Sequence, residues 1–299
     1  MNTAWVKAIR PKTLVASILP VCLSISSFEP VIISNTWIPA LLCLIFALLV
    51  QIGTNLSNDY YDALRGTDYF RTNAPSRMVA EGVLSEKAVF KASIFVLIMA
   101  FVVGSCAVIL SDASPWFLLF GLVCIFLAYA YTGGSFPIAY NGLGDVFVVL
   151  FFGFGAVEGT RILLSHAVGA DWVPQWFVSF GMGLIINNLL VVNNYRDYQC
   201  DKKANKRTTV VIFGKGFGLA LYFISLVCAS IIFPVFTEVP LLCMTTFFPG
   251  IYGLARLYFA SNEKDFSLCL KLAVISVMVY ALTAILSSHL LINSISKIY

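Results

Sequence analysis

The sequence contains few charged residues for its length. Its 299 residues include 15 Asp and Glu and 19 Lys and Arg, so 11% of the chain is charged, whereas 60% is hydrophobic. Soluble domains are typically about 25% charged and about 45–50% apolar. The mean hydropathy of +0.89 points the same way. A chain with so little polar surface is not expected to fold in water, and a protein with several membrane-spanning segments is the simplest interpretation.

Histidines and paired cysteines are also scarce. The two histidines, His166 and His289, lie far along the chain from the acidic stretches, so a histidine-ligated metal centre is not expected. None of the eight cysteines forms a C-x-x-C pair, and most of them lie in apolar runs. This distribution argues against a disulfide framework and a structural zinc site. The net charge of +4 is too small to indicate a nucleic-acid partner.

Long apolar runs make up most of the remaining chain. A bilayer core of about 30 Å needs about 20 apolar residues per helix. We find nine such runs, near residues 13–33, 37–57, 89–110, 115–132, 145–164, 172–193, 216–236, 239–260 and 266–292. They are continuous rather than alternating, which indicates helices and not a membrane barrel. We therefore predict an all-α integral membrane protein, with one domain over residues 1–299 and nine transmembrane helices in a lipid bilayer.

The distribution of Lys and Arg predicts the orientation of these helices. With the N-terminus in the cytoplasm, nearly all of the 19 cations fall on the cytoplasmic side, and Arg161 and Lys297 are the exceptions. Cytoplasmic loops of membrane proteins carry such an excess of Lys and Arg. The long loops 58–88 and 194–215 then share the cytoplasmic face. Four predicted helices separate them, which is compatible with a parallel internal repeat.

Two polar stretches interrupt this apolar sequence, "NDYYDALRGTD" at 58–68 and "NNYRDYQCDKKANKRT" at 193–208. In the second, Asn193, Asp197, Asp201 and Asn205 recur every four residues and are expected on one helical face. In the first, the same spacing separates Asn58 from Asp62. Two such columns on one membrane face are more than topology-setting loops require.

The acidic residues in these stretches suggest a metal site. Five aspartates gathered at one membrane surface would repel one another unless a cation lay among them. Carboxylate and amide oxygens are hard ligands suited to Mg²⁺, which is often bound through one or two carboxylates together with substrate phosphates. The Arg and Lys residues beside them could then contact those phosphates.

A diphosphate site beside an apolar interior fits the transfer of a polyprenyl group. The isoprenoid tail would lie among the helices, while Mg²⁺ and cations would neutralise the departing diphosphate. Exclusion of water would protect the resulting allylic cation until an electron-rich aromatic acceptor attacks it.

Two other interpretations compete with an enzyme. The acidic stretches could be solvated loops that set the topology, or they could belong to a cation-coupled transporter, because intramembrane carboxylates often mark ion pathways. The aspartates are expected at span ends rather than at mid-depth. Glu158 and Arg161, which are expected within a span, are three residues apart and can neutralise each other.

The two stretches resemble the motifs of the UbiA superfamily of intramembrane prenyltransferases. That family carries N-D-x-x-D after the second of nine helices and D-x-x-x-D after the sixth, and this chain has "NDYYD" at 58–62 and "DYQCD" at 197–201. Within the superfamily, the sequence is most similar to the branch that prenylates 1,4-dihydroxy-2-naphthoate. "RPKTL" at 10–14 and "YTGGSFPIAYNGLGD" at 131–145 carry this resemblance. Ser135 and Asp145 replace the usual Pro and Glu of that branch.

The resemblance implies a role for each site residue. Two Mg²⁺ ions would be held by two sets of oxygen ligands, which are Asn58, Asp59, Asp62 and Asp68, and Asn193, Asn194, Asp197 and Asp201. The prenyl diphosphate would be bound by five cations, which are Arg71, Arg77, Arg196, Lys206 and Arg207. Catalysis would rest on the metal-binding Asp62, Asp197 and Asp201, with Asp145 and Tyr131 facing the acceptor.

The resemblance also implies the reaction. It is Mg²⁺-dependent transfer from polyprenyl diphosphate to 1,4-dihydroxy-2-naphthoate with decarboxylation, giving demethylmenaquinone, in a bacterial plasma membrane with the site loops on the cytoplasmic face. Other acceptors of the superfamily stay open, namely 4-hydroxybenzoate, haem, a chlorophyll precursor or a glycerol lipid.

Overall fold

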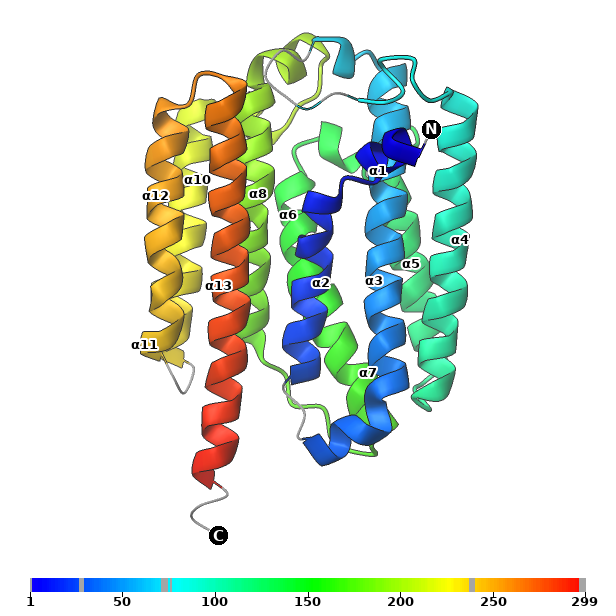
Figure 1. The fold of residues 1–299 in the computed structure, drawn as a ribbon, viewed down its shortest axis with the longest axis vertical. Coiled ribbons are helices and arrows are strands. Elements are labelled where there is room, and N and C mark those ends of the chain that lie inside the picture. The colour runs from blue at the N-terminus through cyan, green and yellow to red at the C-terminus, as the bar shows by residue number, and fades with distance from the viewer. Residues whose placement is uncertain (1, 27–29, 71–74, 76, 237–239, 296–299) are drawn as a thin grey trace.

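The structure, a computed structural model, describes residues 2–26, 30–70, 75, 77–236 and 240–295. Throughout these residues the regular elements are helices, apart from a single bridge between Asn141 and Arg207. The long helical rods form a bundle (Figure 1). They are built from α2 (Pro11–Ser26), α3 (Pro30–Leu64), α4 (Glu86–Leu110), α5 (Trp116–Ala130), α6 (Gly144–Val148) with η3 (Val149–Glu158) and α7 (Gly159–Ala167), α8 (Trp176–Lys203), α10 (Lys215–Val227) with η4 (Cys228–Ile232) and η5 (Phe233–Phe236), α11 (Pro240–Cys243) with η6 (Met244–Thr246) and α12 (Phe247–Phe259), and α13 (Glu263–Ile295).

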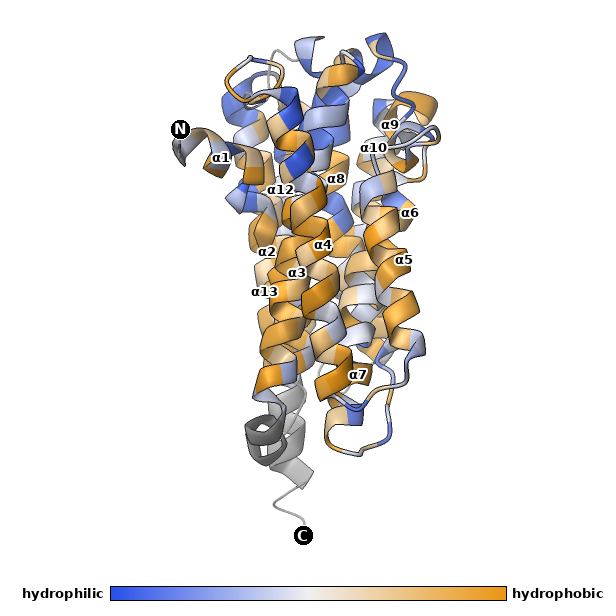
Figure 2. Ribbon diagram, turned by 90° about the vertical axis from the view of Figure 1, so that its right-hand side faces the viewer, coloured by the Kyte–Doolittle hydropathy of each residue, from blue (hydrophilic) through white to orange (hydrophobic). Residues whose placement is uncertain are grey.

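Four short helices lie at one end of the bundle. They are α1 (Asn2–Ile9), η1 (Asp68–Phe70), η2 (Ile138–Tyr140) and α9 (Thr209–Phe213). The ribbon in Figure 2 is hydrophilic at this end and hydrophobic along the middle of the rods. We call this end, which also carries the last turns of α3 and α8, the polar end of the bundle.

The helices are long and apolar enough for a multi-pass membrane protein. In the part of the chain that the structure describes, six qualify as spans by themselves, and they are Thr36–Leu64, Glu86–Leu110, Gly144–Ala167, Trp176–Lys203, Lys215–Val235 and Glu263–Ser287. The bent pair α1 and α2 together would make a seventh, and α5 is a shorter apolar helix. The all-helical membrane architecture predicted from the sequence is confirmed, while the number of nine spans stays a prediction.

Several predicted helix boundaries differ from the structure. The first predicted span, 13–33, is interrupted, because α2 ends at Ser26 and α3 begins at Pro30. Two further differences concern the acidic motifs. The apolar runs ended at residues 57 and 193, but α3 continues to Leu64 and α8 to Lys203. Both acidic motifs therefore lie on the last turns of long helices and not in loops. Hydropathy missed these turns because their polar side chains face an internal cavity rather than lipid. The column of α8 stops at Asp201, because Asn205 lies beyond the helix in a left-handed conformation with φ of 54°.

Proline and glycine shape the bundle at two places. Pro11, which has no N–H to donate, follows Arg10 in a left-handed conformation, and α1 and α2 meet there at 47°. Gly153 and Gly183 let η3 lie directly against α8. A Cβ atom at either glycine would come within 2.6 Å of a backbone oxygen of the other segment, so no side chain fits there.

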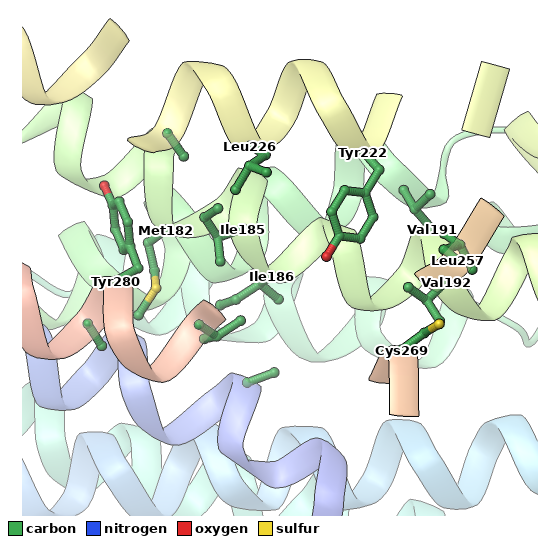
Figure 3. Packing of buried hydrophobic residues seen from close by; sticks show 14 of the residues in the cluster. Met182, Ile185, Ile186, Val191, Val192, Tyr222, Leu226, Leu257, Cys269 and Tyr280 are labelled. Atoms are coloured by element: carbon green, nitrogen blue, oxygen red, sulfur yellow. The ribbon is translucent and has the colours of Figure 1, made fainter. Parts of the chain in front are cut away.

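The hydrophobic core surrounds α8. Its residues Met182, Ile185, Ile186, Val191 and Val192 are almost completely buried. Figure 3 shows side chains of α10, α12 and α13 packed around them, including Tyr222, Leu226, Leu257, Cys269 and Tyr280. Dense packing of this kind gives a fixed frame for the polar turns at the end of α8.

Candidate active site

A large cavity runs through the bundle from its polar end. Its volume is about 1210 Å³. Twelve of the predicted site residues line it, namely Asn58, Asp59, Asp62, Arg77, Tyr131, Asp145, Asn193, Asn194, Arg196, Asp197, Asp201 and Lys206. The structure thus brings the ends of α3 and α8 to one cavity, although they are more than 130 residues apart in the sequence.

The deeper part of the cavity is apolar and reaches α7 near the opposite end of the bundle (Figure 1). Phenylalanines from several helices line this part, and they include Phe46, Phe101, Phe117, Phe120, Phe147 and Phe151. Gly155 and Gly159 also face it, and a Cβ atom at either would meet nothing closer than 3.6 Å. Unlike Gly153, these glycines leave open space. The cavity therefore has a charged mouth and a hydrocarbon-like interior.

The end of α3 supplies three of the oxygen-bearing side chains. Asp59 and Asp62 are 1% and 2% exposed. Asn58 accepts a hydrogen bond of 2.6 Å from the hydroxyl of Thr132, which fixes the orientation of its amide. Arg10, at the bend between α1 and α2, lies near enough to Asp59 to interact with its carboxylate electrostatically.

Asp62 is the most heavily engaged carboxylate of this turn. It accepts a hydrogen bond of 2.7 Å from the phenol of Tyr140, which also shares a hydrogen bond of 2.7 Å with Thr67. The ammonium group of Lys206 lies 3.5 Å from both oxygens of Asp62. Lys206 follows the second acidic motif, so this contact joins the two motifs directly.

The end of α8 supplies the second set of side chains. Asp197 and Asp201 are 4% and 1% exposed. Arg196 donates two hydrogen bonds to Asp197, of 2.7 and 2.9 Å, in the two-pronged geometry that makes such pairs strong. Asn193 instead donates to the backbone carbonyl of Leu189 on its own helix, at 3.0 Å.

Asp145 and Tyr131 lie on another wall of the cavity. Asp145 is 8% exposed and accepts hydrogen bonds from Asn187, at 3.1 Å, and from Thr209, at 2.6 Å. The hydroxyl of Tyr131 lies close to Gly144, since a Cβ atom there would be 3.2 Å from it. A carboxylate and a phenol are therefore available to a polar acceptor beside the acidic turns.

Two of the predicted site residues lie off the cavity, and a third is not described. Asp68 lies in η1 and does not line the cavity, but its Oδ1 is 3.5 Å from Nε of Arg77, which does. Arg207 is exposed and lies off the cavity wall. Arg71 falls outside the residues that the structure describes.

A divalent cation fits the mouth of the cavity. Among the described residues, no three His, Cys, Asp or Glu side chains are arranged to hold a metal ion by themselves. Mg²⁺ does not need such a set when substrate phosphates complete its ligands. Neither oxygen of Asp59 makes a hydrogen bond of ordinary length and angle, and a buried carboxylate needs positive charge beside it. These donors are hard oxygens, so they suit Mg²⁺ bridged to a diphosphate.

Sequence reasoning gave no role to several polar residues of the site. Tyr140, Thr132 and Arg65 belong to this group. Arg65 donates to the carbonyl of Gly134 at 2.9 Å and also bonds the carbonyl of Thr132, which holds the segment after α5 against the end of α3. Tyr140 stands within "YTGGSFPIAYNGLGD", so the resemblance of that stretch was the available signal. The contact it makes was not predictable, because 78 residues separate Tyr140 from Asp62.

Known proteins are similar to this chain in sequence and in fold. A model of the UbiA prenyltransferase family matches residues 19–289. The chain belongs to this family. The resemblance noted in the acidic motifs is thereby confirmed. Its relatives are named prenyltransferases, and this UbiA family member is a prenyltransferase as well.

Two relatives are similar over most of their length. The 1,4-dihydroxy-2-naphthoate octaprenyltransferase of Mycobacterium leprae is 35% identical over 228 residues, which cover 76% of this chain and 75% of that protein. The protein of the same name from Escherichia coli is 31% identical over 243 residues, again covering 76% and 75%.

Solved structures of UbiA homologs share the fold. One from Archaeoglobus fulgidus, bound to DMAPP and Mg²⁺, has a TM-score of 0.66 at 15% identity and covers 94% of this chain and 98% of that one. Another from Aeropyrum pernix has a TM-score of 0.67 at 15% identity, covering 88% and 94%. At these identities the likeness establishes the fold of this UbiA family member and not its substrates.

Proposed function

We propose that this protein transfers a polyprenyl group from polyprenyl diphosphate to 1,4-dihydroxy-2-naphthoate. The acceptor loses its carboxylate as CO₂, the donor releases diphosphate, and the product is demethylmenaquinone, formed first as the hydroquinone. The observation that carries the proposal is the single cavity with two acidic motifs at its mouth and an apolar interior. The relatives named 1,4-dihydroxy-2-naphthoate octaprenyltransferase support the choice of acceptor.

In this proposal the residues at the mouth bind the diphosphate. Asp59 and Asp62 on α3 and Asp197 and Asp201 on α8 hold Mg²⁺, with Asn58, Asn193, Asn194 and Asp68 as further oxygen donors, and two ions are expected, one for each motif. When bound, Mg²⁺ supplies positive charge that stabilises the departing diphosphate. Lys206, Arg196 and Arg77 add fixed positive charge at the same place. Arg71 and Arg207 stay proposed members of this set on the resemblance alone.

The acceptor is proposed to lie against Asp145 and Tyr131. The carboxylate of Asp145 is held by Asn187 and Thr209, so it can accept a hydrogen bond from an acceptor hydroxyl without reorienting. The apolar interior takes the isoprenoid tail and excludes water, which would otherwise capture the allylic cation. Holding the acceptor and excluding water both require that the side chains around the cavity stay in place. The packed hydrophobic core around α8 supports them.

The same proposal includes the membrane topology. Nine spans with a cytoplasmic N-terminus would place the polar end of the bundle, and with it the mouth of the cavity, at the cytoplasmic face of a bacterial plasma membrane. The six apolar helices, the bent pair α1 and α2, and the excess of Lys and Arg in the predicted cytoplasmic loops support this arrangement. Labelling of single cysteines introduced at the two ends in intact cells would test it.

The reaction is tested with purified protein, Mg²⁺, a polyprenyl diphosphate and dihydroxynaphthoate labelled in its carboxylate. We expect prenylated naphthoquinone, diphosphate and labelled CO₂, and no transfer in EDTA. Asp62→Asn and Asp197→Asn should abolish transfer, while the melting temperature of each variant shows that it is folded. Full activity in EDTA would contradict the proposal.

The alternative functions give different results in the same assay. Another acceptor of the superfamily, such as 4-hydroxybenzoate, would be prenylated without release of CO₂ from dihydroxynaphthoate. A cation-coupled transporter would accumulate solute in vesicles and release no diphosphate. At the far end of the bundle Glu158 and Arg161 form an ion pair, and Arg161 also donates to the carbonyl of Val173. Because their charges neutralise each other, this pair gives no support to ion transport through the molecule.

A further inference from the structure

Tyr140 lies at the point where the two acidic motifs meet. It ends the short helix η2, and its side chain is 8% exposed. Its hydroxyl is 2.7 Å from Oδ1 of Asp62 and 2.7 Å from Oγ1 of Thr67. The phenol donates a hydrogen bond to Asp62 and accepts one from Thr67.

The same residue is tied to the segment that follows the second motif. The backbone N–H of Arg207 donates to the carbonyl of Tyr140 at 3.1 Å. The ammonium group of Lys206 lies 5.0 Å from the centre of the Tyr140 ring, within the range of a cation–π contact. The guanidinium of Arg65 lies 4.9 Å from that ring. Tyr140 thus touches the carboxylate of one motif and the cation of the other.

From this geometry we propose that Tyr140 is a positioning residue that holds Asp62 and Lys206 in a fixed arrangement for the diphosphate head of the substrate. The inference rests on the proposed function, because it concerns the binding of that head group. A hydrogen bond to one oxygen stops the carboxylate of Asp62 from rotating. The face of the ring keeps the ammonium of Lys206 beside it. Neither group would hold this position alone, since each ends a side chain with free torsions.

The two functions of the side chain can be separated by substitution. Tyr140→Phe removes the hydroxyl and keeps the ring, so Asp62 loses the hydrogen bond from the phenol while the ring still supports Lys206. Hydrogen bonds to charged groups contribute about 1.5–3 kcal/mol, which corresponds to a loss of prenyl diphosphate affinity on the order of 10- to 100-fold. Tyr140→Leu removes the ring as well and should weaken binding further.

The test measures binding directly, with a prenyl thiolodiphosphate that cannot transfer its tail, in the presence of Mg²⁺. We expect Tyr140→Phe to weaken the binding of this probe and to raise the Mg²⁺ concentration needed for half-saturation. The KM for the acceptor should stay unchanged. Tyr280→Phe is the matched control, because Tyr280 is also a buried tyrosine that donates a hydrogen bond, to the carbonyl of Val178 at 2.9 Å, but it does not line the cavity.

The outcomes separate this inference from the proposed function. Unchanged probe affinity in Tyr140→Phe, or an equal loss in Tyr280→Phe, would overturn the inference. If Tyr140→Phe does not fold, Thr67→Val removes the other partner of the phenol and should give a smaller loss in the same direction, and no loss there would also overturn it. An unmodified protein that binds no prenyl thiolodiphosphate would instead reject the proposed function.

Discussion

Lys206 offers the sharpest test of the electrostatics at the mouth of the cavity. Its side chain is 10% exposed and that of Asp62 is 3% exposed, and the ammonium nitrogen lies 3.5 Å from the carboxylate. Lys206 thus brings a positive charge next to the buried carboxylate of Asp62. Lys206→Met keeps the length of the side chain and removes the charge, so it leaves the carboxylate buried without that neutralising partner.

The size of the effect follows from this burial. Removing one partner of a buried ion pair costs about 3–5 kcal/mol, and the 3.5 Å separation favours the lower end of that range. A loss of about 3 kcal/mol should lower the melting temperature by about 6 °C, at about 2 °C per kcal/mol for a chain of this size. Added Mg²⁺ can replace the lost charge at Asp62. We therefore expect Mg²⁺ to stabilise Lys206→Met more than it stabilises the unmodified protein.

Thermal unfolding of the detergent-solubilised protein, once with EDTA and once with Mg²⁺, measures the loss of melting temperature and the stabilisation by Mg²⁺. Lys206→Arg retains the charge and is the control, with a melting temperature in EDTA close to that of the unmodified protein. Equal melting temperatures of Lys206→Met and the unmodified protein in EDTA would refute the reasoning. So would a stabilisation by Mg²⁺ that is the same in both proteins, because the ion would then not be compensating Asp62.

Three further predictions concern other parts of the molecule. Gly155→Leu and Gly159→Leu should fill the apolar part of the cavity, so kcat/KM should fall more steeply as the prenyl tail lengthens; a loss that does not depend on tail length would contradict this. Glu158→Gln leaves Arg161, 3.8 Å away, without its counter-charge and should lower the melting temperature by a few degrees, with both KM values unchanged. Asp145→Asn should raise the KM for the acceptor and leave that for prenyl diphosphate unchanged, as steady-state kinetics with each substrate varied would reveal.

The periodicity of the acidic residues predicted their placement better than hydropathy did. A spacing of four residues puts Asp197 and Asp201 on one helical face, and both do line the cavity from α8. Hydropathy ended the helix ten residues too early, because it assumes that a polar turn lies outside the membrane bundle. It gave no indication of the π-helical segment η3 either, since residues 149–157 form a continuous apolar run that is indistinguishable from part of an ordinary span.

Contacts between segments far apart in the chain could not be predicted from the sequence. The pairing of Asp62 with Lys206 spans 144 residues. The electrostatic interaction of Arg10 with Asp59 joins the bend between α1 and α2 to the end of α3. "RPKTL" gave no reason to prefer a site contact over a membrane anchor, because both uses need the same cation. In the structure Arg10 lines the cavity.

The acidic side chains at the mouth, and Asp68 beside it, already have cations as neighbours. Arg196 pairs with Asp197 and Arg77 with Asp68, as Lys206 does with Asp62. In the proposed function these same cations bind the diphosphate and these same carboxylates bind Mg²⁺. Binding is then an exchange of partners, in which a cation turns to phosphate only as the metal takes its place at the carboxylate. Mg²⁺ and diphosphate should therefore bind with positive coupling, each raising the affinity for the other by the same factor.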